Sequence, residues 1–406
     1  MISERGAVSP LRQLAATPGL VSVLVWGFAG RLHLSATLFA LLVMATEVTG
    51  SYAAAGVVSG ALVLGQGITA PLRGRVVDRR PAARYLATTS ALYGCGVAAL
   101  AAVPAAAGMA PLVVAAFAVG CCCPPGTQIS RAKVSQLARG AVRQRAFAVQ
   151  ATANELVLVT GPGATALVIA AVGARGAVVV SGLLAVAGGV GLALAVRRAG
   201  IDRPPPEHPA GHGGRSPLRV PGVARSVLSV TLFVTCFAMI DFVLIAWSYE
   251  RGTPALGGVL IGVWAVGSVL GGLAATLWLT GGGNPRARMA VVGCGVALLI
   301  PALSPALTGG RVWPVGLALL LGGALIPPAL AVVYDVVGDA AGPACRAEVF
   351  GWIASGTTAA TAVANPLSGL LVDRWGAVAA AVAAAGMCGL AAGCMGRPPV
   401  VRAAPS

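Results

Sequence analysis

APLRGRVVDRR, residues 70–80, sets one acid, Asp78, among four arginines. On either side of this stretch lie long runs that contain almost no polar residue. A charge cluster between two apolar runs of this length is typical of a turn at a membrane surface. The stretch therefore raises two questions: whether the chain spans a bilayer, and why a turn rich in arginine contains an acid.

The composition of the chain fits lipid as its solvent. Of the 406 residues, 57% are apolar and 10% are charged, whereas soluble proteins contain about 25% charged residues. A chain with so few polar side chains cannot cover a water-facing surface with them. We therefore predict an all-α integral membrane protein, because helices satisfy their own backbone hydrogen bonds in lipid.

Several function classes are excluded by what the sequence lacks. The net charge of +16 comes from arginines in short segments between apolar runs, which is unlike the clustered basic face of a nucleic-acid binder. The nine cysteines show no spacing typical of a metal site. Neither a phosphate-binding glycine loop nor a catalytic triad is evident. We predict no nucleic-acid partner, no metal, no cofactor and no enzymatic activity.

Twelve apolar runs are long enough to cross a bilayer as helices, which takes about 20 residues. They cover residues 19–44, 53–72, 85–106, 111–130, 146–171, 176–196, 226–249, 255–280, 288–307, 313–334, 349–371 and 377–396. Basic residues of short loops stay in the cytoplasm. With both termini inside, the outer turns contain only Arg175, Arg251, Arg311 and Arg374, and Arg31 lies within a span. This asymmetry predicts a multi-pass protein of the cell membrane with cytoplasmic termini, and we expect a monomer.

A segment rich in Pro and Gly, residues 199–225, separates the first six runs from the last six. Its composition predicts a cytoplasmic linker between an N-terminal bundle, residues 1–198, and a C-terminal bundle, residues 226–406. A shift of 203 residues overlays matching residues of the two bundles, and it pairs Gly120 with Gly323, Pro124 with Pro327, Pro125 with Pro328, Arg143 with Arg346 and Phe147 with Phe350. One common offset predicts a duplication, and an even number of spans per copy makes the copies parallel.

Twelve spans in two parallel six-helix halves, a basic central loop and the GRVVDR segment together resemble the major facilitator superfamily of secondary transporters. The resemblance covers essentially the whole chain. The loop pattern of that family is matched by Gly74, Asp78 and Arg79, although Pro81 stands where a further glycine is expected. The resemblance implies alternating access, with the first, fourth, seventh and tenth spans lining a central path and the fifth beside the first.

The fifth span contains a second sign of that family. Gly161, Pro162 and Gly163 match the core of the Gly-Pro signature of exporters, whereas Thr165 and Ala166 stand where glycines are expected. The resemblance therefore implies an exporter, and this implication rests only on the three residues at the core of the signature.

Asp78 is the residue that topology alone does not require, because orientation needs only the arginines. An acid held near the N-terminus of a neighbouring helix can close an inner gate through charge-assisted hydrogen bonds. Such an acid releases the gate when the two halves rock. The alternative is a solvated charged turn that only orients the protein.

Three charged residues lie inside apolar runs, where charge is costly and usually faces a protein interior or a watery cavity. They are Arg31, Glu155 and Asp241. We expect Arg31 to pair with Glu155 and Asp241 to face the same cavity from the other half. Glu155 or Asp241 would carry a coupled proton, since a cavity that wets and dries changes the affinity of a carboxylate for protons. The alternative is a permanent structural pair and a helix-end cap.

Neutral polar groups accompany Glu155 on the fifth span. Gln150 and Asn154 precede it by five residues and by one. They either hydrogen-bond a substrate or bridge neighbouring helices.

Asp373 and Arg374 repeat the charged pattern late in the chain, in GLLVDRWG. The count of spans places them in an outer turn. The alternative is that the number of spans is miscounted late in the chain.

These features predict a secondary active transporter with proton-coupled export of a small apolar or cationic molecule. An apolar substrate is favoured because the spans offer few polar side chains. Proton-coupled uptake of a sugar or another metabolite is the alternative, and a transport-dead membrane sensor on the same fold is a third possibility.

Overall fold

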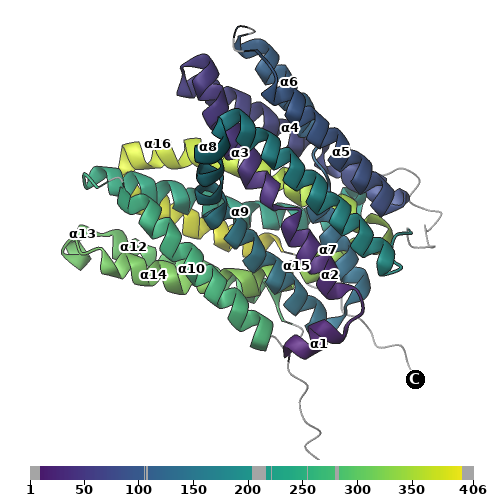
Figure 1. The fold of residues 1–406 in the computed structure, drawn as a ribbon. Coiled ribbons are helices and arrows are strands. Elements are labelled where there is room, and N and C mark those ends of the chain that lie inside the picture. Colours follow the sequence, from purple (N-terminus) through teal and green to yellow (C-terminus); the bar gives the residue numbers. More distant parts are fainter. Residues whose placement is uncertain are drawn as a thin grey trace, which may run out of the picture.

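The computed structural model describes residues 10–395 except 105, 107, 204–215, 221, 254 and 279–282. Every regular element among these residues is a helix (Figure 1). The first half contains α1 (Pro10–Ala16), α2 (Leu20–Ala29), α3 (Leu32–Thr49), α4 (Tyr52–Arg79), α5 (Ala82–Ala101), α6 (Met109–Cys121), α7 (Gly126–Leu137) and α8 (Gly140–Arg198). The second half contains η2 (Pro217–Arg219), α9 (Val223–Glu250), α10 (Ala255–Trp278), α11 (Pro285–Ala297), α12 (Leu299–Leu303), α13 (Pro305–Thr308), α14 (Trp313–Ala324), α15 (Ile326–Ala340), η3 (Pro343–Cys345) and α16 (Arg346–Cys394).

The helices form twelve membrane spans. Nine stretches of the described residues have the length and apolarity of a span. α8 and α16 each turn at a glycine with non-helical backbone, Gly173 and Gly376, and so each contains two spans. With the second span of each and the 20-residue helix α5, the count reaches twelve. Four of the other spans are each built from two helices that meet at a break: α2 with α3, α6 with α7, α11 with α12, and α14 with α15.

The backbone repeats with the offset of 203 residues that the sequence predicts. Gly173 has φ 74° and ψ 169°, and Gly376 has φ 78° and ψ 172°. α2 and α9 begin at positions 20 and 223, each after a glycine with positive φ. α4 and α10 begin at 52 and 255, and α5 and α11 begin at 82 and 285. Because the equivalent helices run in the same order and direction, the two halves are parallel copies of one six-helix unit.

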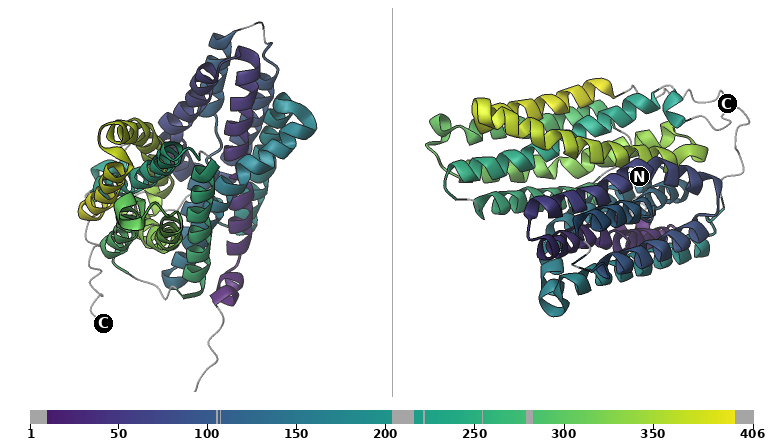
Figure 2. Two further views of the ribbon diagram at one scale, coloured as in Figure 1. Left: turned by 90° about the vertical axis from the view of Figure 1, so that its left-hand side faces the viewer. Right: turned by 90° about the horizontal axis from the view of Figure 1, so that it is seen from above.

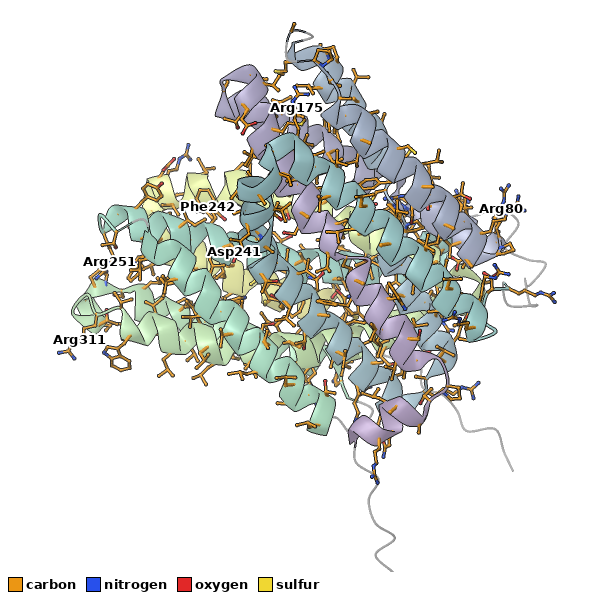
Figure 3. The ribbon with its side chains drawn as sticks, viewed as in Figure 1. Arg80, Arg175, Asp241, Phe242, Arg251 and Arg311 are labelled. Atoms are coloured by element: carbon orange, nitrogen blue, oxygen red, sulfur yellow. The ribbon has the colours of Figure 1, made fainter. Side chains whose placement is uncertain are left out.

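One end of the molecule carries most of the arginines, and we call it the arginine-rich end. It contains Arg80 between α4 and α5, the start and the end of α8, and the start of α16. Arg175, Arg251 and Arg311 lie at the far tips of the two halves (Figure 3). In Figure 2 the halves form two groups of ribbons, purple to teal and green to yellow, and their far tips diverge.

The hydrophobic core shows where the halves meet. One cluster of buried side chains contains residues of both halves, and its N-terminal members, such as Val77, Ile129 and Phe147, lie toward the arginine-rich end. A second cluster contains only residues of the N-terminal half, such as Leu41, Leu112 and Val178, toward the other end. The two halves are therefore packed together at the arginine-rich end and separate at the other.

The outer surface of the bundle is apolar, as a lipid-facing surface must be. Leu167 is 75% exposed, Val114 69% and Leu183 64%. A soluble protein rarely exposes contiguous apolar surface of this kind.

The arginine-rich stretch of residues 70–80 is helical as far as Arg79, which corrects the prediction that the stretch is a turn. α4 continues through Asp78 to Arg79, and only Arg80 and Pro81 connect it to α5. The helix extends beyond the apolar run because its last turns pack against the other half, burying Val77 and Asp78.

The predicted division of the chain at the central linker stays a prediction. α8 ends at Arg198 and α9 begins at Val223. Most of the linker, residues 204–215 and 221, lies outside the described residues.

Candidate gate and transport cavity

Asp78 joins the two halves by binding the N-terminus of α16. Its Oδ1 accepts a hydrogen bond from the backbone N–H of Ala347 (3.0 Å), and its Oδ2 accepts one from the N–H of Glu348 (2.8 Å). The first N–H groups of a helix have no partner within the helix and carry its positive dipole. A carboxylate at this position satisfies two of them at once, with charge assistance.

An ion pair lies beside this contact. Arg75 donates from Nε to Glu348 Oε2 (3.0 Å) and from Nη2 to Glu348 Oε1 (2.7 Å). This bidentate geometry fixes both side chains. Glu348 is buried, whereas the side chain of Arg75 is 29% exposed. The pair therefore lies at the edge of the interface, where it can exchange with water when the halves separate.

Gly74 permits the close approach of α4 to α16. A Cβ atom at Gly74 would overlap the carbonyl oxygen of Ala347 and the Cα of Glu348. Gly351, one turn further along α16, approaches the backbone of Ala70 in the same way. We call Gly74, Arg75 and Asp78 of α4, together with Ala347 and Glu348 of α16, the gate.

The third residue of the predicted motif, Arg79, is not part of the gate. It is exposed, and its side chain forms no hydrogen bond or ion pair with a described residue. The proline that departs from the family pattern is accommodated, because Arg80 (φ −128°) and Pro81 (φ −54°) are both in conformations open to any residue. The turn here does not need glycine.

A second polar clamp closes the other side of the same end. Arg143, in the first turn of α8, forms a bidentate pair with Asp339 of α15 (2.7 and 2.6 Å) and a further ion pair with Asp335. Gln144 donates to Asp335 Oδ2 (2.9 Å). Arg346 of α16 lies 3.8 Å from Asp339. We call Arg143, Gln144, Asp335, Asp339 and Arg346 the clamp.

Sequence reasoning missed the two acids of the clamp. Asp335 and Asp339 directly follow the tenth apolar run, residues 313–334, and neither is among the predicted site residues. The available signal was their spacing of four residues, which places both on one helix face, opposite an arginine that the repeat had already singled out.

Aromatic side chains lie between the gate and the clamp. Phe147 of α8, Tyr334 of α15 and Phe350 of α16 form a triangle with ring centroids 6.2 to 6.3 Å apart. The guanidinium of Arg131 lies 4.1 Å from the centre of the Tyr334 ring, a cation–π contact. Phe147 and Phe350 are equivalent in the repeat, so each copy contributes this ring to the layer, and the C-terminal copy adds Tyr334. All three rings are buried, and they seal the arginine-rich end.

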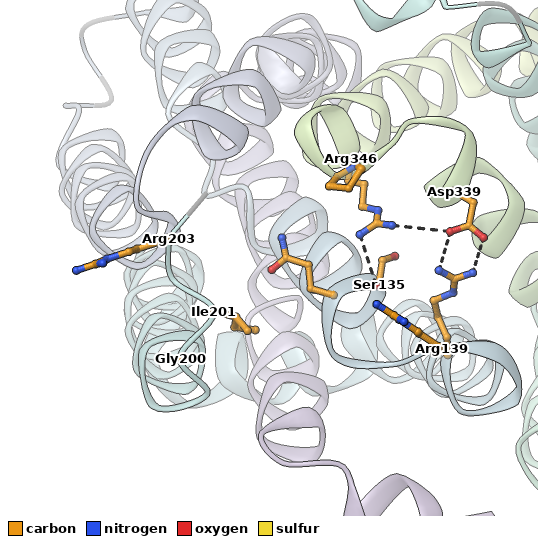
Figure 4. Close-up of a pocket in the computed structure, with 10 residues that line it drawn as sticks. Ser135, Arg139, Gly200, Ile201, Arg203, Asp339 and Arg346 are labelled. Atoms are coloured by element: carbon orange, nitrogen blue, oxygen red, sulfur yellow. Dashed lines mark hydrogen bonds and ion pairs between the residues drawn. The ribbon is translucent and has the colours of Figure 1, made fainter. Parts of the chain in front are cut away.

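A cavity of about 690 Å³ opens at the arginine-rich end, next to the clamp. Figure 4 shows Arg346 between Asp339 and Ser135 at its wall, with Arg139 and the start of the central linker nearby. Arg346 donates to the carbonyl of Ser135 across the two halves (3.5 Å). The clamp is thus reached by water from this side.

Arg31 lies at the break between α2 and α3 and is 2% exposed. The predicted ion pair between Arg31 and Glu155 does not form in this conformation. Arg31 Nη1 instead donates to the backbone carbonyl of Gln150 (3.1 Å), and Gln150 Nε2 donates to Ser130 Oγ (2.7 Å). Glu155 lies more than one helical turn beyond Gln150 on α8, which places it toward the open end, away from Arg31.

Glu155 of α8 and Asp241 of α9 belong to different halves, and each is partly buried. Neither forms an ion pair with a basic residue of the described chain. Asp241 lies in the middle of α9, away from the tips that carry Arg175 and Arg251 (Figure 3). Asn154 is partly buried beside Glu155. The structure thus places two acids without an ion-pair partner within helices of the two halves.

The Gly-Pro signature lies further along α8. Gly161 faces the first span so closely that a Cβ atom would overlap Ser35, whereas Gly163 has open space around it. Pro162 lies inside the helix. Gly161 therefore sets the packing of the fifth span against the first.

Asp373 and Arg374 precede Gly376, where α16 turns. α16 begins against Asp78 at the arginine-rich end and crosses once before this turn. The two charges lie at the end opposite the arginine-rich end, as the count of spans predicts.

A metal site is not evident among the described residues, where no cluster of three His, Cys, Asp or Glu side chains occurs.

Comparisons with known proteins agree with this architecture. A family model described as Major Facilitator Superfamily matches residues 22–354. Among curated proteins, none matches the chain. The structure of the fucose:proton symporter of E. coli superimposes with a TM-score of 0.70 at 16% identity, over 96% of this chain and 100% of that one.

Two further structures are similar. A bacterial homologue of the iron transporter ferroportin, in an outward-facing state, gives a TM-score of 0.68 at 13% identity, over 92% of this chain and 98% of that one. The human organic anion transporter MFSD10 gives 0.67 at 17% identity, over 92% and 99%. At these identities the likeness shows the shared fold alone.

Proposed function

Because the chain belongs to the major facilitator superfamily, we propose that it is a secondary active transporter that exports a small molecule in exchange for protons by alternating access. The single observation that carries this proposal is the position of the contacts between the halves. The gate, the clamp and the aromatic layer all lie toward the arginine-rich end. This conformation is closed there and open at the other end.

The contacts at the closed end are of a kind that can break reversibly. Asp78 binds backbone N–H groups, and Arg75, Arg143 and Arg346 pair with carboxylates. The side chains of Arg75 and Asp339 are 29% and 52% exposed, so water can replace these bonds on opening. Rocking of two rigid halves around such contacts is how a fold of two parallel repeats alternates its access.

Glu155 and Asp241 are the groups that we propose to carry the proton. Both lie at membrane depth, and basic partners are missing for each among the described residues. A carboxylate in a poorly solvated interior favours its protonated form, and it can release the proton when the site becomes wet. Spans with two acids and few other polar side chains also fit an apolar or cationic substrate. We place the protein in the cell membrane, with the arginine-rich end and both termini in the cytoplasm.

The test is ethidium transport in everted vesicles, with and without a proton gradient. We expect gradient-dependent uptake of the dye into the vesicles by the native protein, and loss of the gradient dependence in Glu155→Gln and Asp241→Asn. Glu250→Gln is the matched control, since Glu250 is exposed at the tip of α9. Dye movement in the opposite direction would contradict export, and unchanged proton coupling in both acid variants would contradict the role of these acids.

A further inference from the structure

A groove that transport does not use lies on the N-terminal half, between the start of α5 and the end of α8. It has a volume of about 500 Å³. Ala87 of α5 and Val190, Ala193 and Leu194 of α8 form its apolar wall. Arg84 and Arg197 lie at its arginine-rich end. All the residues that line it belong to the N-terminal half or to the short segment that follows α8.

Hydrogen bonds fix the closed end of the groove. The backbone carbonyl of Asp202 accepts a hydrogen bond from the N–H of Ala82 (3.2 Å), and its Oδ1 accepts one from the N–H of Ala83 (2.7 Å). Asp202 thereby caps the first turn of α5. Lys133 donates from Nζ to the carbonyl of Ile201. These bonds hold the segment after α8 against α5, so the groove has a fixed shape.

The charge at this end of the groove is positive. Arg84 and Arg197 are both exposed, and neither guanidinium forms a hydrogen bond or an ion pair with a described residue. The carboxylate of Asp202 lines the same groove but is used by the backbone of α5. Two guanidinium groups therefore face one opening, with a single acid that is already bound.

The surface that continues from the groove is apolar. Leu92 on α5 is 56% exposed, and Leu183, Val190 and Leu194 on α8 are 64%, 39% and 43% exposed. These side chains extend away from the arginines along both helices. The groove therefore combines a basic end at the level of the lipid headgroups with an apolar wall at the level of the acyl chains.

We propose that this groove binds an anionic phospholipid, with the phosphate between Arg84 and Arg197 and an acyl chain along α5 and α8. Basic pockets between spans on the cytoplasmic side suit phosphate headgroups, and guanidinium binds phosphate in a bidentate manner. The bound lipid holds α5 against α8 within one half. Its binding therefore does not depend on whether the gate is open.

Lipid binding to the purified full-length protein tests this proposal, with native mass spectrometry as the readout. Phosphatidylglycerol and phosphatidylcholine are the two probes. We expect the native protein to retain phosphatidylglycerol preferentially. The double variant Arg84→Gln with Arg197→Gln should bind phosphatidylglycerol about 30-fold more weakly, since each arginine near an anionic lipid contributes about a factor of five. Its binding of phosphatidylcholine should not change.

A matched control separates this site from general surface charge. Arg219 and Arg225 are exposed at the same end of the molecule, in the other half. Arg219→Gln with Arg225→Gln removes the same charge and should leave phosphatidylglycerol binding unchanged. An equal loss in both double variants would overturn the proposal, as would undiminished binding in the Arg84 and Arg197 variant.

Two further experiments test the groove without a change of charge and test a ligand without acyl chains. Ala87→Phe fills the groove without changing charge, and it should weaken phosphatidylglycerol binding as well. If Ala87→Phe binds the lipid normally, the groove is not the site. Glycerol 3-phosphate carries the headgroup without acyl chains, and it should not raise the unfolding temperature. If it raises this temperature as much as the lipid does, the site is one for free phosphate compounds.

Discussion

At the scale of single residues, Asp78 answers the question that the arginine-rich stretch raises. Its two oxygens accept hydrogen bonds from two backbone N–H groups of α16. The acid therefore stabilises the contact with the neighbouring helix and not its own segment. Arg79, adjacent in sequence, makes no such contact. The motif therefore contains one residue that joins the halves and one whose charge is free to orient the chain.

Asp78→Asn should open the gate. The amide retains one acceptor but loses the charge, and a hydrogen bond to a charged group contributes about 1.5 to 3 kcal/mol. We expect at least a tenfold rise in the labelling rate of a cysteine at Ser135, which is buried between the halves, by a membrane-impermeant maleimide from the arginine-rich side. The background is a variant without the nine native cysteines.

The control for this experiment is Arg79→Gln. It removes a charge from the same motif at a residue that does not contact α16. Its labelling rate should equal that of the parent. Equal acceleration in both variants would show that the stretch acts only through its net charge.

Gly74→Ala should prevent the gate from closing, because the added methyl group would overlap the backbone of α16, and a backbone cannot move aside as a side chain can. We expect loss of transport and a labelling rate at Ser135 as high as in Asp78→Asn. Gly60→Ala lies on the same helix with open space around it, and it should transport normally. Normal transport by Gly74→Ala would contradict the close approach.

At the scale of helices, the arginine-rich end is closed by two unlike contacts. α4 meets α16 through glycines and a helix N-terminus, whereas α8 meets α15 through charged side chains. A duplicated backbone could form the same contact twice. Among the residues of the gate and the clamp, however, only Arg143 and Arg346 are identical residues at equivalent positions in the two copies. The two copies thus share their backbone arrangement but differ in their polar contacts.

An exchange of charges tests the clamp between α8 and α15. Arg143→Asp should weaken closure, since it places a third acid beside Asp335 and Asp339. Adding Asp339→Arg should restore part of it, because the pair forms again with reversed charges. We expect the Ser135 labelling rate to rise in the single variant and to fall again in the double variant. Additive effects would show that the two side chains do not interact in solution.

The elements themselves could be predicted from sequence to different degrees. The twelve spans follow from apolar length, and their repeat follows from a few matched residues, because bilayer thickness and backbone pairing leave few alternatives. The end of α4 was mispredicted, since its last turns contain arginines and are stabilised by the other half. The partner of Arg31 was also mispredicted, because a buried arginine can bind a backbone carbonyl, and sequence contains no signal for that choice.

At the scale of the whole molecule, two parallel six-helix halves touch at one end and diverge at the other. The shared hydrophobic cluster and the separate N-terminal cluster reflect this arrangement directly. Which end is closed could not be predicted from sequence, because both end states use the same helices and differ only in how the halves are tilted.

The central claim, that the halves rock about a gate at the arginine-rich end, is tested most directly by electron–electron distance measurements between spin labels. One pair of labels, at Arg80 and Arg225, spans the arginine-rich end, and another, at Val172 and Leu307, spans the opposite end; all four residues are exposed. Introducing Asp78→Asn should lengthen the first distance and shorten the second in the same sample. Two distances that stay unchanged, or that lengthen together, would contradict alternating access through this gate.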